Sequence, residues 1–458
     1  MKFKKLALTN AKDLVFGKAP YPVKTPRGLI IGGGNVYPEL NFTLDSMDIN
    51  DKTIDSIVGQ YRNIVQDALE RGVQLYSRGI VFEFETLPEM TKNPDYGVRI
   101  IEAMNEVCED FFTREGIPSE IRLTPNDLRE FERPPRQRTS HLLDSMLELF
   151  DRGAAAGGDL LSIESTGGKE LFDDALMNCN IKEMVFSLCV LGVRDMKMLW
   201  GKIVEIAERH GKTAGGDTAC GFGNTAMVLA EKRYIPKIVA AFVRIISVVR
   251  TIVAIEEGAK GPDKDCGYEG VYLKAITGTP ISMEGKTSSC AHFSPVGNIS
   301  AACADLWSNE SVQNIKLLAG MAPTVYLEQL EYDTRLFNQA IKGGPSEISV
   351  LQRQLVESDM YLDPQAFILA PSNVITISSE MVKGGSYLEC AVLGALKGLE
   401  LIEEAIASGK LRSSEMENIW IQTIRDELVA IPADESMFIE EMLGVVDSNK
   451  FIKEEYGM

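Results

Sequence analysis

From about residue 79 onward, short apolar runs alternate with amphipathic helical stretches, and this alternation restricts the fold more than any other feature of the chain. Such alternation indicates a parallel β-sheet with helices packed against it. Polar, glycine-rich segments follow the apolar runs, and a barrel gathers all its strand ends on one face. We therefore predict an α/β fold, a TIM (β/α)8 barrel. The predicted strands are Gly79–Glu85, Asp159–Ser165, Met184–Gly192, Thr213–Gly221, Ile252–Gly258, Pro280–Lys286 and Phe367–Asn373, with helices such as Ser140–Gly157 and Arg194–Lys212 between them.

The two ends of the chain lack this regular alternation. Residues 1–75 mix Pro, Gly and Asn with few periodic runs, so we predict an irregular N-terminal extension with a helix near Asp51–Arg71. Its GGGN segment does not have the GxGxxG spacing of a dinucleotide-binding loop. Residues 76–458 are predicted to form one catalytic barrel unit. Segments Ala301–Ser378 and Leu388–Lys453 contain more helix than one repeat needs, so we expect additional C-terminal helical layers.

The charge of the chain excludes several classes of partner. The 458 residues carry a formal net charge of -19, which disfavours nucleic acid and anionic membrane surfaces. We find no uninterrupted run of eighteen apolar residues and no signal-peptide pattern at the start, so we expect a cytoplasmic protein. Its eight cysteines are then expected to be mostly reduced thiols.

Three segments at predicted strand ends contain residues suited to chemistry. Glu164 ends the apolar run of LLSIESTGG, Cys220 lies in GGDTACGFGN, and Cys266 lies in the polar loop DKDCGYEG. Glycines crowd around Cys220 and are expected to allow close backbone approach in a narrow pocket. These glycines are Gly215, Gly216, Gly221 and Gly223.

One carboxylate and two thiolates are suitable zinc donors. If Glu164, Cys220 and Cys266 meet at the mouth of the barrel, three protein ligands leave the fourth tetrahedral position open, which is the catalytic arrangement. A structural zinc site uses four ligands, often in CxxC pairs, and the chain has no CxxC. The alternative is that the cysteines are unrelated buried residues and the glutamate forms a salt bridge.

The other cysteines and histidines suggest fewer functions. Cys290 and His292 could be a ligand pair; alternatively, Cys290 is a small core residue and His292 packs in a loop. His141 and His210 lie at helix ends and need no function. No GxSxG, HExxH or GxxxxGK[ST] motif occurs. Five cysteines in apolar runs are predicted to be core: Cys108, Cys179, Cys189, Cys303 and Cys390.

The strings GDLLSIESTGGKELFD, GGDTACGFGNTA and GPDKDCGYEGVYLKAITGTPISMEGKTSSCAHFSPVGN resemble the methanol:corrinoid methyltransferases, the zinc subunit of the methanol-activating system of methylotrophic anaerobes. The resemblance covers nearly the whole chain. It implies a TIM barrel with N-terminal and helical additions. It also implies a zinc ion bound by Glu164 (SIESTGG), Cys220 (DTACGFGN) and Cys266 (KDCGYEG).

The resemblance implies that zinc activates methanol and that Co(I) of a corrinoid on a partner protein takes the methyl group, giving methyl-Co(III). The chain itself is expected to carry no corrinoid, because none of its three histidines lies in the DxHxxG segment of the family's corrinoid protein. A general acid could assist C–O cleavage, with Asp217, Glu256 and Glu257 as candidates; the alternative is that they form salt bridges or orient ligands. We expect a homo-oligomer or a hetero-oligomer with the corrinoid protein.

Three other functions remain open at this point. Zinc could activate a thiol or another methyl donor, although such sites favour His and Cys ligands in a late HxC…C order. The chain could be a non-enzymatic scaffold that binds a corrinoid protein, or a metal-free barrel enzyme in which the cysteines are core. Zinc analysis of the purified protein separates the last function from the others.

Overall fold

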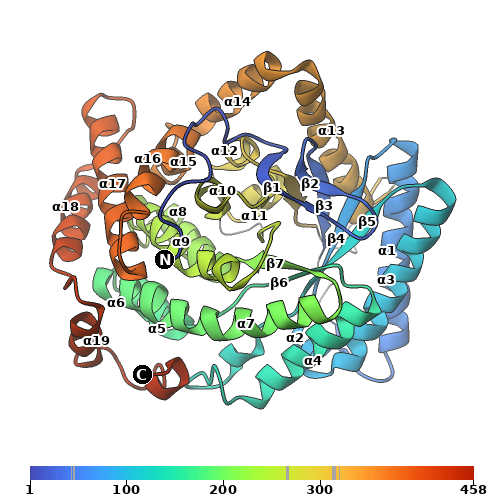
Figure 1. Cartoon of the computed structure of the whole chain (residues 1–458), viewed down its shortest axis with the longest axis horizontal. Coiled ribbons are helices and arrows are strands. Elements are labelled where there is room, and N and C mark those ends of the chain that lie inside the picture. Colours follow the sequence, from blue (N-terminus) through green and yellow to red (C-terminus); the bar gives the residue numbers. More distant parts are fainter. Residues whose placement is uncertain (43, 45–46, 265–267, 312–315, 319) are drawn as a thin grey trace.

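The computed structural model describes residues 1–42, 44, 47–264, 268–311, 316–318 and 320–458. Its central element is a parallel sheet whose strands lie in the order β7-β6-β5-β4-β3-β9-β8. Figure 1 shows the sheet surrounded by helices. The seven strands are β3 (Tyr37–Asn41), β4 (Ile80–Glu85), β5 (Ser119–Thr124), β6 (Leu160–Ile163), β7 (Thr213–Asp217), β8 (Ser282–Glu284) and β9 (Leu306–Asn309).

A short extended segment, residues 260–264, joins the two edges of this sheet. The Lys260 amide donates to Ala214 of β7, and Asp263 forms a parallel bridge to Ile281 beside β8. The segment therefore takes the eighth position between β7 and β8, and the sheet closes as a (β/α)8 barrel. The predicted fold class is confirmed.

The interior of the barrel changes from apolar to charged along the strands, as residues two apart on a strand face the same side. At the amino ends, Leu160 and its neighbours on other strands pack with Leu29 and Ile31 from the hairpin of β1 (Lys18–Lys24) and β2 (Ile30–Gly33). Two residues further along, Arg122 of β5 pairs with Glu39 of β3, and both are fully buried. The next inward positions reach the carboxyl ends of the strands, where the barrel opens.

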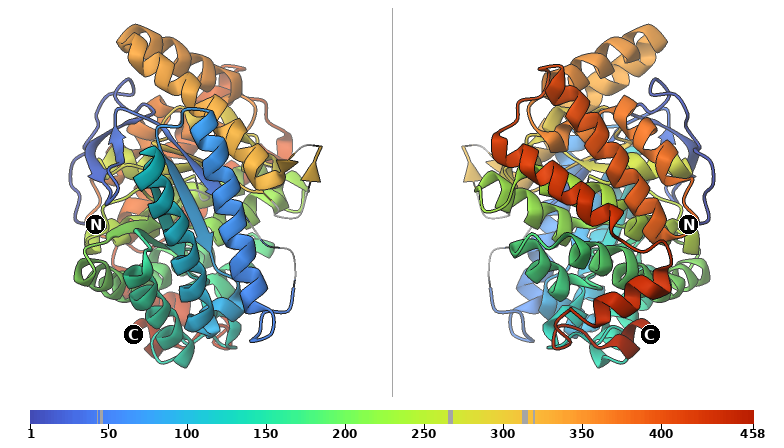
Figure 2. Two further views of the ribbon diagram at one scale, coloured as in Figure 1. Left: turned by 90° about the vertical axis from the view of Figure 1, so that its right-hand side faces the viewer. Right: turned by 90° about the vertical axis from the view of Figure 1, so that its left-hand side faces the viewer.

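The helices form a ring around the barrel, with an extra layer on one side. Figures 1 and 2 show α1, α3 and α4 side by side on one flank and α17 and α18 on the opposite flank. The barrel helices are α1 (Ile54–Gln74), α2 (Pro88–Lys92), α3 (Pro94–Glu115), α4 (His141–Ala156), α5 (Lys169–Met177), α6 (Ile181–Val185), α7 (Val193–Arg209), α8 (Cys220–Glu231), α9 (Lys237–Glu257), α10 (Gly270–Thr277), α11 (Lys286–Ala291), α12 (Gly297–Ala301) and α13 (Ala322–Gly343). The added helices are α14 (Pro345–Asp359), α15 (Pro364–Leu369), α16 (Pro371–Met381), α17 (Tyr387–Ala407), α18 (Glu415–Val429) and α19 (Glu435–Leu443). Shorter elements are η1 (Leu128–Phe131), η2 (Phe186–Gly192), η3 (Lys453–Tyr456), β10 (Lys316–Leu317) and β11 (Gly320–Met321).

The helices predicted near Asp51–Arg71, over Ser140–Gly157 and over Arg194–Lys212 are confirmed as α1, α4 and α7. The extra helix expected after residue 301 is confirmed as well. Strand β3, however, lies within residues 1–75, the segment predicted as an extension, and it is hydrogen-bonded to β4 and β9 in the barrel sheet. The extension therefore contributes one barrel strand.

Three of the predicted strands are helical. Residues 184–192 form the end of α6 and the π-helical η2, residues 252–258 end α9, and residues 367–373 join α15 to α16. All three segments are mostly buried, and a helix that is buried all round has no polar face to reveal its period. Strands β3, β5 and β9 were not predicted, because the barrel interior gives them inward-facing polar side chains.

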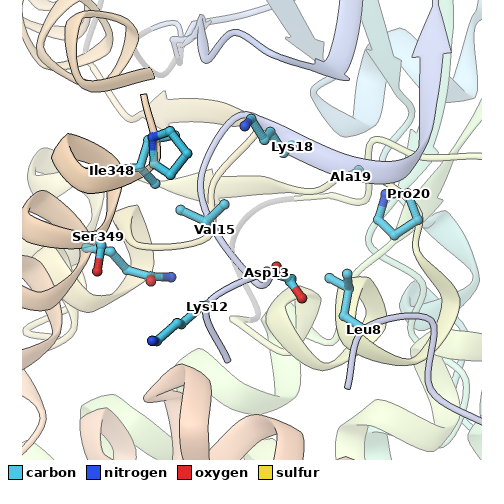
Figure 3. A pocket seen from close by; sticks show the side chains of 11 residues that line it. Leu8, Lys12, Asp13, Val15, Lys18, Ala19, Pro20, Ile348 and Ser349 are labelled. Carbon is cyan, nitrogen blue, oxygen red and sulfur yellow. The ribbon is translucent and has the colours of Figure 1, made fainter. Parts of the chain in front are cut away.

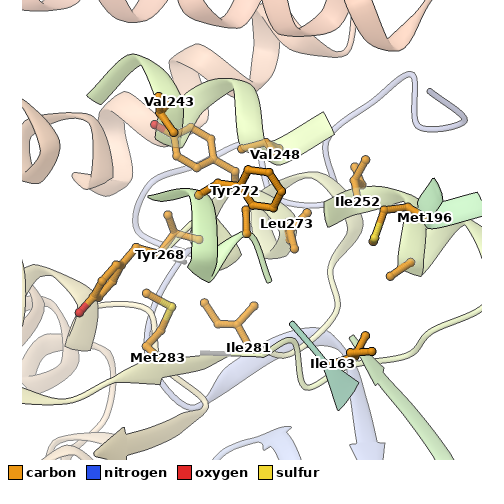
Figure 4. Close-up of a cluster of buried hydrophobic side chains, with 14 of the residues drawn as sticks. Ile163, Met196, Val243, Val248, Ile252, Tyr268, Tyr272, Leu273, Ile281 and Met283 are labelled. Atoms are coloured by element: carbon orange, nitrogen blue, oxygen red, sulfur yellow. The ribbon is translucent and has the colours of Figure 1, made fainter. Parts of the chain in front are cut away.

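Helix α9 is the most apolar element of the chain. By length and composition this helix could cross a membrane. However, 94% of its most apolar stretch is buried inside the protein. Helices α15, α17 and α18 cover α9 on its outer side. Figure 4 shows Val243 and Val248 of α9 near Tyr272 of α10, and Ile252 of α9 on the side of Met196, all within one buried cluster. Helix α9 is therefore a core helix.

A pocket of about 450 Å³ lies at the amino end of the barrel. Figure 3 shows it between the N-terminal segment around Leu8 and Val15, the start of β1, and Ile348 of α14. The Ala7 amide donates to the Ile276 carbonyl near the end of α10, and the chain enters β8 shortly after this helix. The pocket is thus on the face opposite the strand ends that hold the candidate site.

Candidate metal centre

Two of the three predicted ligands lie at the carboxyl ends of neighbouring strands. Glu164 follows β6, and its side chain is 30% exposed. Cys220 is the first residue of α8, three residues after the end of β7. Strands β6 and β7 are paired, with Ile163 opposite Asp217, so both residues belong to the same side of the barrel mouth. The third predicted ligand, Cys266, lies outside the described residues.

Lys264 places a positive charge next to Glu164. Its Nζ lies 2.5 Å from Glu83 Oε1 and 3.6 Å from Glu164 Oε1, and the lysine side chain is 1% exposed. Thr124 donates a hydrogen bond of 2.8 Å to the same oxygen of Glu83. The lysine thus holds two carboxylates of the barrel interior together. Neither Glu83 nor Lys264 was predicted from the sequence, although the inward alternation of β4 was visible in VFEFE.

The loop that follows Glu164 is fixed by four different parts of the chain. Ser165 donates its hydroxyl to Asp217 at 2.6 Å, and Arg250 of α9 donates to the Ser165 carbonyl and hydroxyl. The Thr166 amide donates to Asp127 at 2.9 Å. The Gly168 amide donates to the hydroxyl of Tyr456 near the C-terminus at 3.0 Å. The backbone that carries Glu164 is therefore held in one position.

Asp217 faces away from the barrel interior. A β-bulge at Gly215 shifts the register between β6 and β7, and Asp217 accepts hydrogen bonds from Trp200 and Ser165 behind the barrel wall. Burial raises the pKa of Asp217, and the Arg250 guanidinium opposes that shift. Its contacts are those of a residue that orients the Glu164 loop, the alternative considered for this candidate acid.

Glu256 and Glu257 are not near the site. Both lie at the C-terminal end of α9, where Glu256 accepts hydrogen bonds from the Lys2 amide and the Tyr387 hydroxyl. The chain turns from there into the start of segment 260–264, at the amino end of the barrel. Their proposal as general acids is wrong, because it depended on a strand at residues 252–258.

A buried glutamate fixes the start of α8 through hydrogen bonds. Glu269, itself 1% exposed, accepts from the Ala219 amide at 2.6 Å and from the Thr251 hydroxyl at 2.8 Å. The Asn224 side-chain amide donates to Cys220 Sγ at 3.1 Å, a contact that favours a negative charge on sulfur. Cys220 takes part in a disulfide in the structure, so its use as a metal ligand requires the reduced thiolate.

The neighbouring glycines serve the packing of the barrel wall. A Cβ atom on Gly215 would lie 2.6 Å from Ser162 Oγ, and one on Gly216 would lie 2.6 Å from Asp263 Oδ1. Gly216 also has a φ of +154°. A Cβ on Gly221 would meet only the Lys169 side chain, at 3.1 Å. Close packing against neighbouring strands, rather than a ligand, explains why positions 215 and 216 are glycine.

Six other cysteines in the described part of the chain are free thiols, and most are core residues. Cys108, Cys189, Cys303 and Cys390 are buried as predicted, whereas Cys179 is only partly buried. Burial raises the pKa of Cys108 and Cys303 to about 12, so neither is a thiolate near neutral pH. Cys290 is exposed on α11, so the interpretation as a small core residue is wrong. His210 bonds to Asp151 at the end of α7, at 2.8 Å.

The described donors fit a thiolate-binding metal. Glu164 offers a partly exposed carboxylate and Cys220 a sulfur with a hydrogen-bond donor beside it, and both stand on rigid strand ends. Carboxylate and thiolate together suit zinc, and a site with fewer than four protein ligands can take up a substrate oxygen.

Comparisons with known proteins give one consistent result. A family model described as methanol-cobalamin methyltransferase B subunit matches residues 1–457. The chain is 36% identical over 463 residues to a methanol–corrinoid protein co-methyltransferase of Methanosarcina barkeri (strain Fusaro / DSM 804), covering 100% of this chain and 99% of that protein. It is also similar to a chain in the crystal structure of the methanol:cobalamin methyltransferase complex MtaBC from Methanosarcina barkeri. That match has a TM-score of 0.94 and 36% identity, and covers 100% of this chain and 99% of the other.

Proposed function

The chain belongs to the methanol-cobalamin methyltransferase B subunit family, and we propose that it acts through one zinc ion bound by Glu164, Cys220 and Cys266. The enzyme transfers the methyl group of methanol to a corrinoid protein, which is its partner. The observation that supports the metal assignment is the position of Glu164 and Cys220 at the carboxyl ends of paired strands.

Methanol is a poor methyl donor, because hydroxide is a poor leaving group. When bound, zinc supplies Lewis acidity at the methanol oxygen, where negative charge develops as the C–O bond breaks. Thiolate ligands reduce the net charge of the metal and weaken this effect. The positive charge of Lys264, 3.6 Å from Glu164, offsets part of the added negative charge.

The protein's own residues keep the ligands in place. Lys264 and Glu83 orient the Glu164 carboxylate from inside the barrel. Asp217 and Arg250 fix Ser165, the residue that follows this ligand. Such supporting contacts to ligands commonly change metal affinity about 10–100-fold when they are removed.

We place the enzyme in the cytoplasm. The free thiols Cys108, Cys179, Cys189, Cys290, Cys303 and Cys390 suit a reducing compartment, and zinc binding by Cys220 requires one. The corrinoid stays on the partner protein, and the methylated corrinoid is the product.

The test is zinc analysis of purified, reduced protein together with methyl transfer from methanol to a reduced corrinoid protein. We expect one zinc per chain, and we expect Glu164→Gln and Cys220→Ser to lose both zinc and activity. Protein that is fully active without zinc would refute the proposal. Methylamine and a thiol, offered in place of methanol, serve as substrate controls.

The third ligand needs its own comparison. Cys266→Ala is expected to lose zinc, while Cys290→Ala, which removes an exposed thiol of α11, is expected to keep it. The opposite result would assign the third ligand to Cys290.

A further inference from the structure

A second group of metal-binding side chains lies at the ends of β8 and β9. Glu284 is the last residue of β8, His292 follows α11, and Glu310 follows β9. His292 Nδ1 lies 3.3 Å from Glu284 Oε2, and His292 Nε2 lies 3.5 Å from Glu310 Oε1. One ligand atom from each of the three lies within 4.8 Å of the others. None of the three belongs to the predicted zinc ligands.

The group combines one rigid, buried ligand with two more accessible ones. Glu284 is 1% exposed, and the Tyr268 hydroxyl donates to its Oε2 at 2.8 Å. Tyr268 is fixed in turn by Ser289, 3.0 Å from its hydroxyl. The side chains of His292 and Glu310 are 23% and 39% exposed, so an ion can reach the group from solvent. A hydrogen bond to the carboxylate ligand is typical of metal centres.

The charges of the three side chains favour a cation over an anion. Two carboxylates converge on one imidazole, which leaves a net negative charge whether the ring is neutral or protonated. The buried guanidinium of Arg244 on α9 interacts electrostatically with Glu284 and offsets part of this negative charge. A divalent cation compensates both carboxylates at once, and it uses the neutral ring as a ligand.

We propose that Glu284, His292 and Glu310 bind a second divalent cation. The donor set is one nitrogen and two carboxylate oxygens with no thiolate, which suits Mn²⁺, Fe²⁺ or Zn²⁺. Three protein ligands leave coordination positions for water or for an oxygen of a bound molecule at the barrel mouth. The inference does not depend on the zinc ion proposed at Glu164, Cys220 and Cys266.

Mn²⁺ is the sharpest probe, because a thiolate-rich site discriminates against it. Zinc-loaded, reduced enzyme is titrated with Mn²⁺, and the free ion is followed by electron paramagnetic resonance. We expect one bound Mn²⁺ per chain and at least a tenfold weaker affinity in His292→Ala and in Glu310→Gln. His210→Ala is the matched control, because His210 also pairs with a carboxylate, Asp151, but with only one.

A second control separates this site from the proposed zinc site. Glu164→Gln is expected to keep Mn²⁺ binding. No saturable Mn²⁺ binding in the wild type, or equal binding in wild type, His292→Ala and Glu310→Gln, overturns the inference. Loss of Mn²⁺ in Glu164→Gln with retention in His292→Ala also overturns it, since the ion then sits with the predicted zinc ligands. Zinc content measured in the same samples reports on the proposed function independently.

Discussion

Charged residues inside the barrel are the feature that most distinguishes this chain at the residue scale. Glu39 pairs with Arg122, and Lys264 joins Glu83 to Glu164, in positions where barrels usually carry branched apolar side chains. Buried ion pairs contribute little net stability, but the loss of one partner leaves an uncompensated charge. Their arrangement here sets the position of the carboxylate of Glu164, the proposed ligand, instead.

Lys264→Met tests this function of the buried lysine. We expect the free energy of unfolding to fall by about 3–5 kcal/mol, because Glu83 and Glu164 lose their shared cation. Chemical denaturation measures the change. Lys260→Met, which alters an exposed lysine in the same segment, is the control and should change little. Equal stability of the two variants would show that the buried pair is dispensable.

Glu120 makes stability depend on pH at the opposite end of the barrel. Burial and the nearby Asp159 carboxylate raise its pKa from 4.5 to about 8. The native state therefore holds this proton at pH values where the unfolded chain has lost it, and the stabilisation present at low pH is lost as pH rises from about 4.5 to about 8.

Glu120→Gln has no titrating group at this position, so it should not lose stability between pH 4.5 and pH 8 through this residue. The difference in melting temperature, variant minus wild type, is expected to increase steadily from pH 5 to pH 8. Other titrating groups cancel in this difference. A difference that is constant with pH would contradict the raised pKa.

At the scale of elements, the loop after β6 is the best-supported part of the site. Strand β7, helix α9, the segment after β5 and the C-terminal 3-10 helix η3 each contribute a hydrogen bond to it. The last contact joins Gly168 to Tyr456, residues separated by 288 positions. The C-terminal segment thus helps to position the loop of Glu164, the proposed ligand.

Tyr456→Phe removes only the hydroxyl that accepts from the Gly168 amide. Because this amide is buried, we expect a loss of about 1–3 kcal/mol in the free energy of unfolding. We also expect slower methyl transfer at unchanged protein concentration, since the Glu164 loop gains freedom. Tyr234→Phe, at a residue that is 70% exposed, is the matched control. Reduced stability with unchanged transfer would limit the C-terminal contact to folding.

At the scale of the whole molecule, added elements cover one flank and the amino end of the barrel, and the proposed metal sites lie at its carboxyl end. Helices α15, α17 and α18 cover α9 on one flank, and the β1–β2 hairpin closes the amino end of the barrel. Both proposed metal sites lie at the carboxyl ends of the strands, where a barrel builds its chemistry from loops. We therefore expect a corrinoid partner to dock on this face.

The purified chain, expressed without its partner, should carry no corrinoid. None of His141, His210 or His292 lies in a DxHxxG segment, and His210 already bonds to Asp151. We expect a colourless protein whose visible spectrum gains corrinoid bands only after the partner is added. A stoichiometric corrinoid spectrum of the chain alone would contradict this prediction.

The local sequence determined the barrel class and the strand-end positions of two candidate site residues. Strand β6 has an apolar run of ordinary length, so its end and Glu164 could be found from the sequence, and Cys220 followed from the glycine-rich turn after β7. Alternation and strand ends are local properties of a chain, so a single sequence records them.

Only the tertiary structure decided which apolar runs are helices and which polar residues face inward. Helix α9 is covered on all sides, so burial removed the polar face that marks a helix, and Glu256 was assigned to a strand. Strand β5 carries Glu120 and Arg122 inward, because partners from distant segments, Arg27 and Glu39, bind to them there. The bulge at Gly215 likewise turned Asp217 outward. Such environments depend on contacts between residues far apart in the sequence, and a local pattern does not contain them.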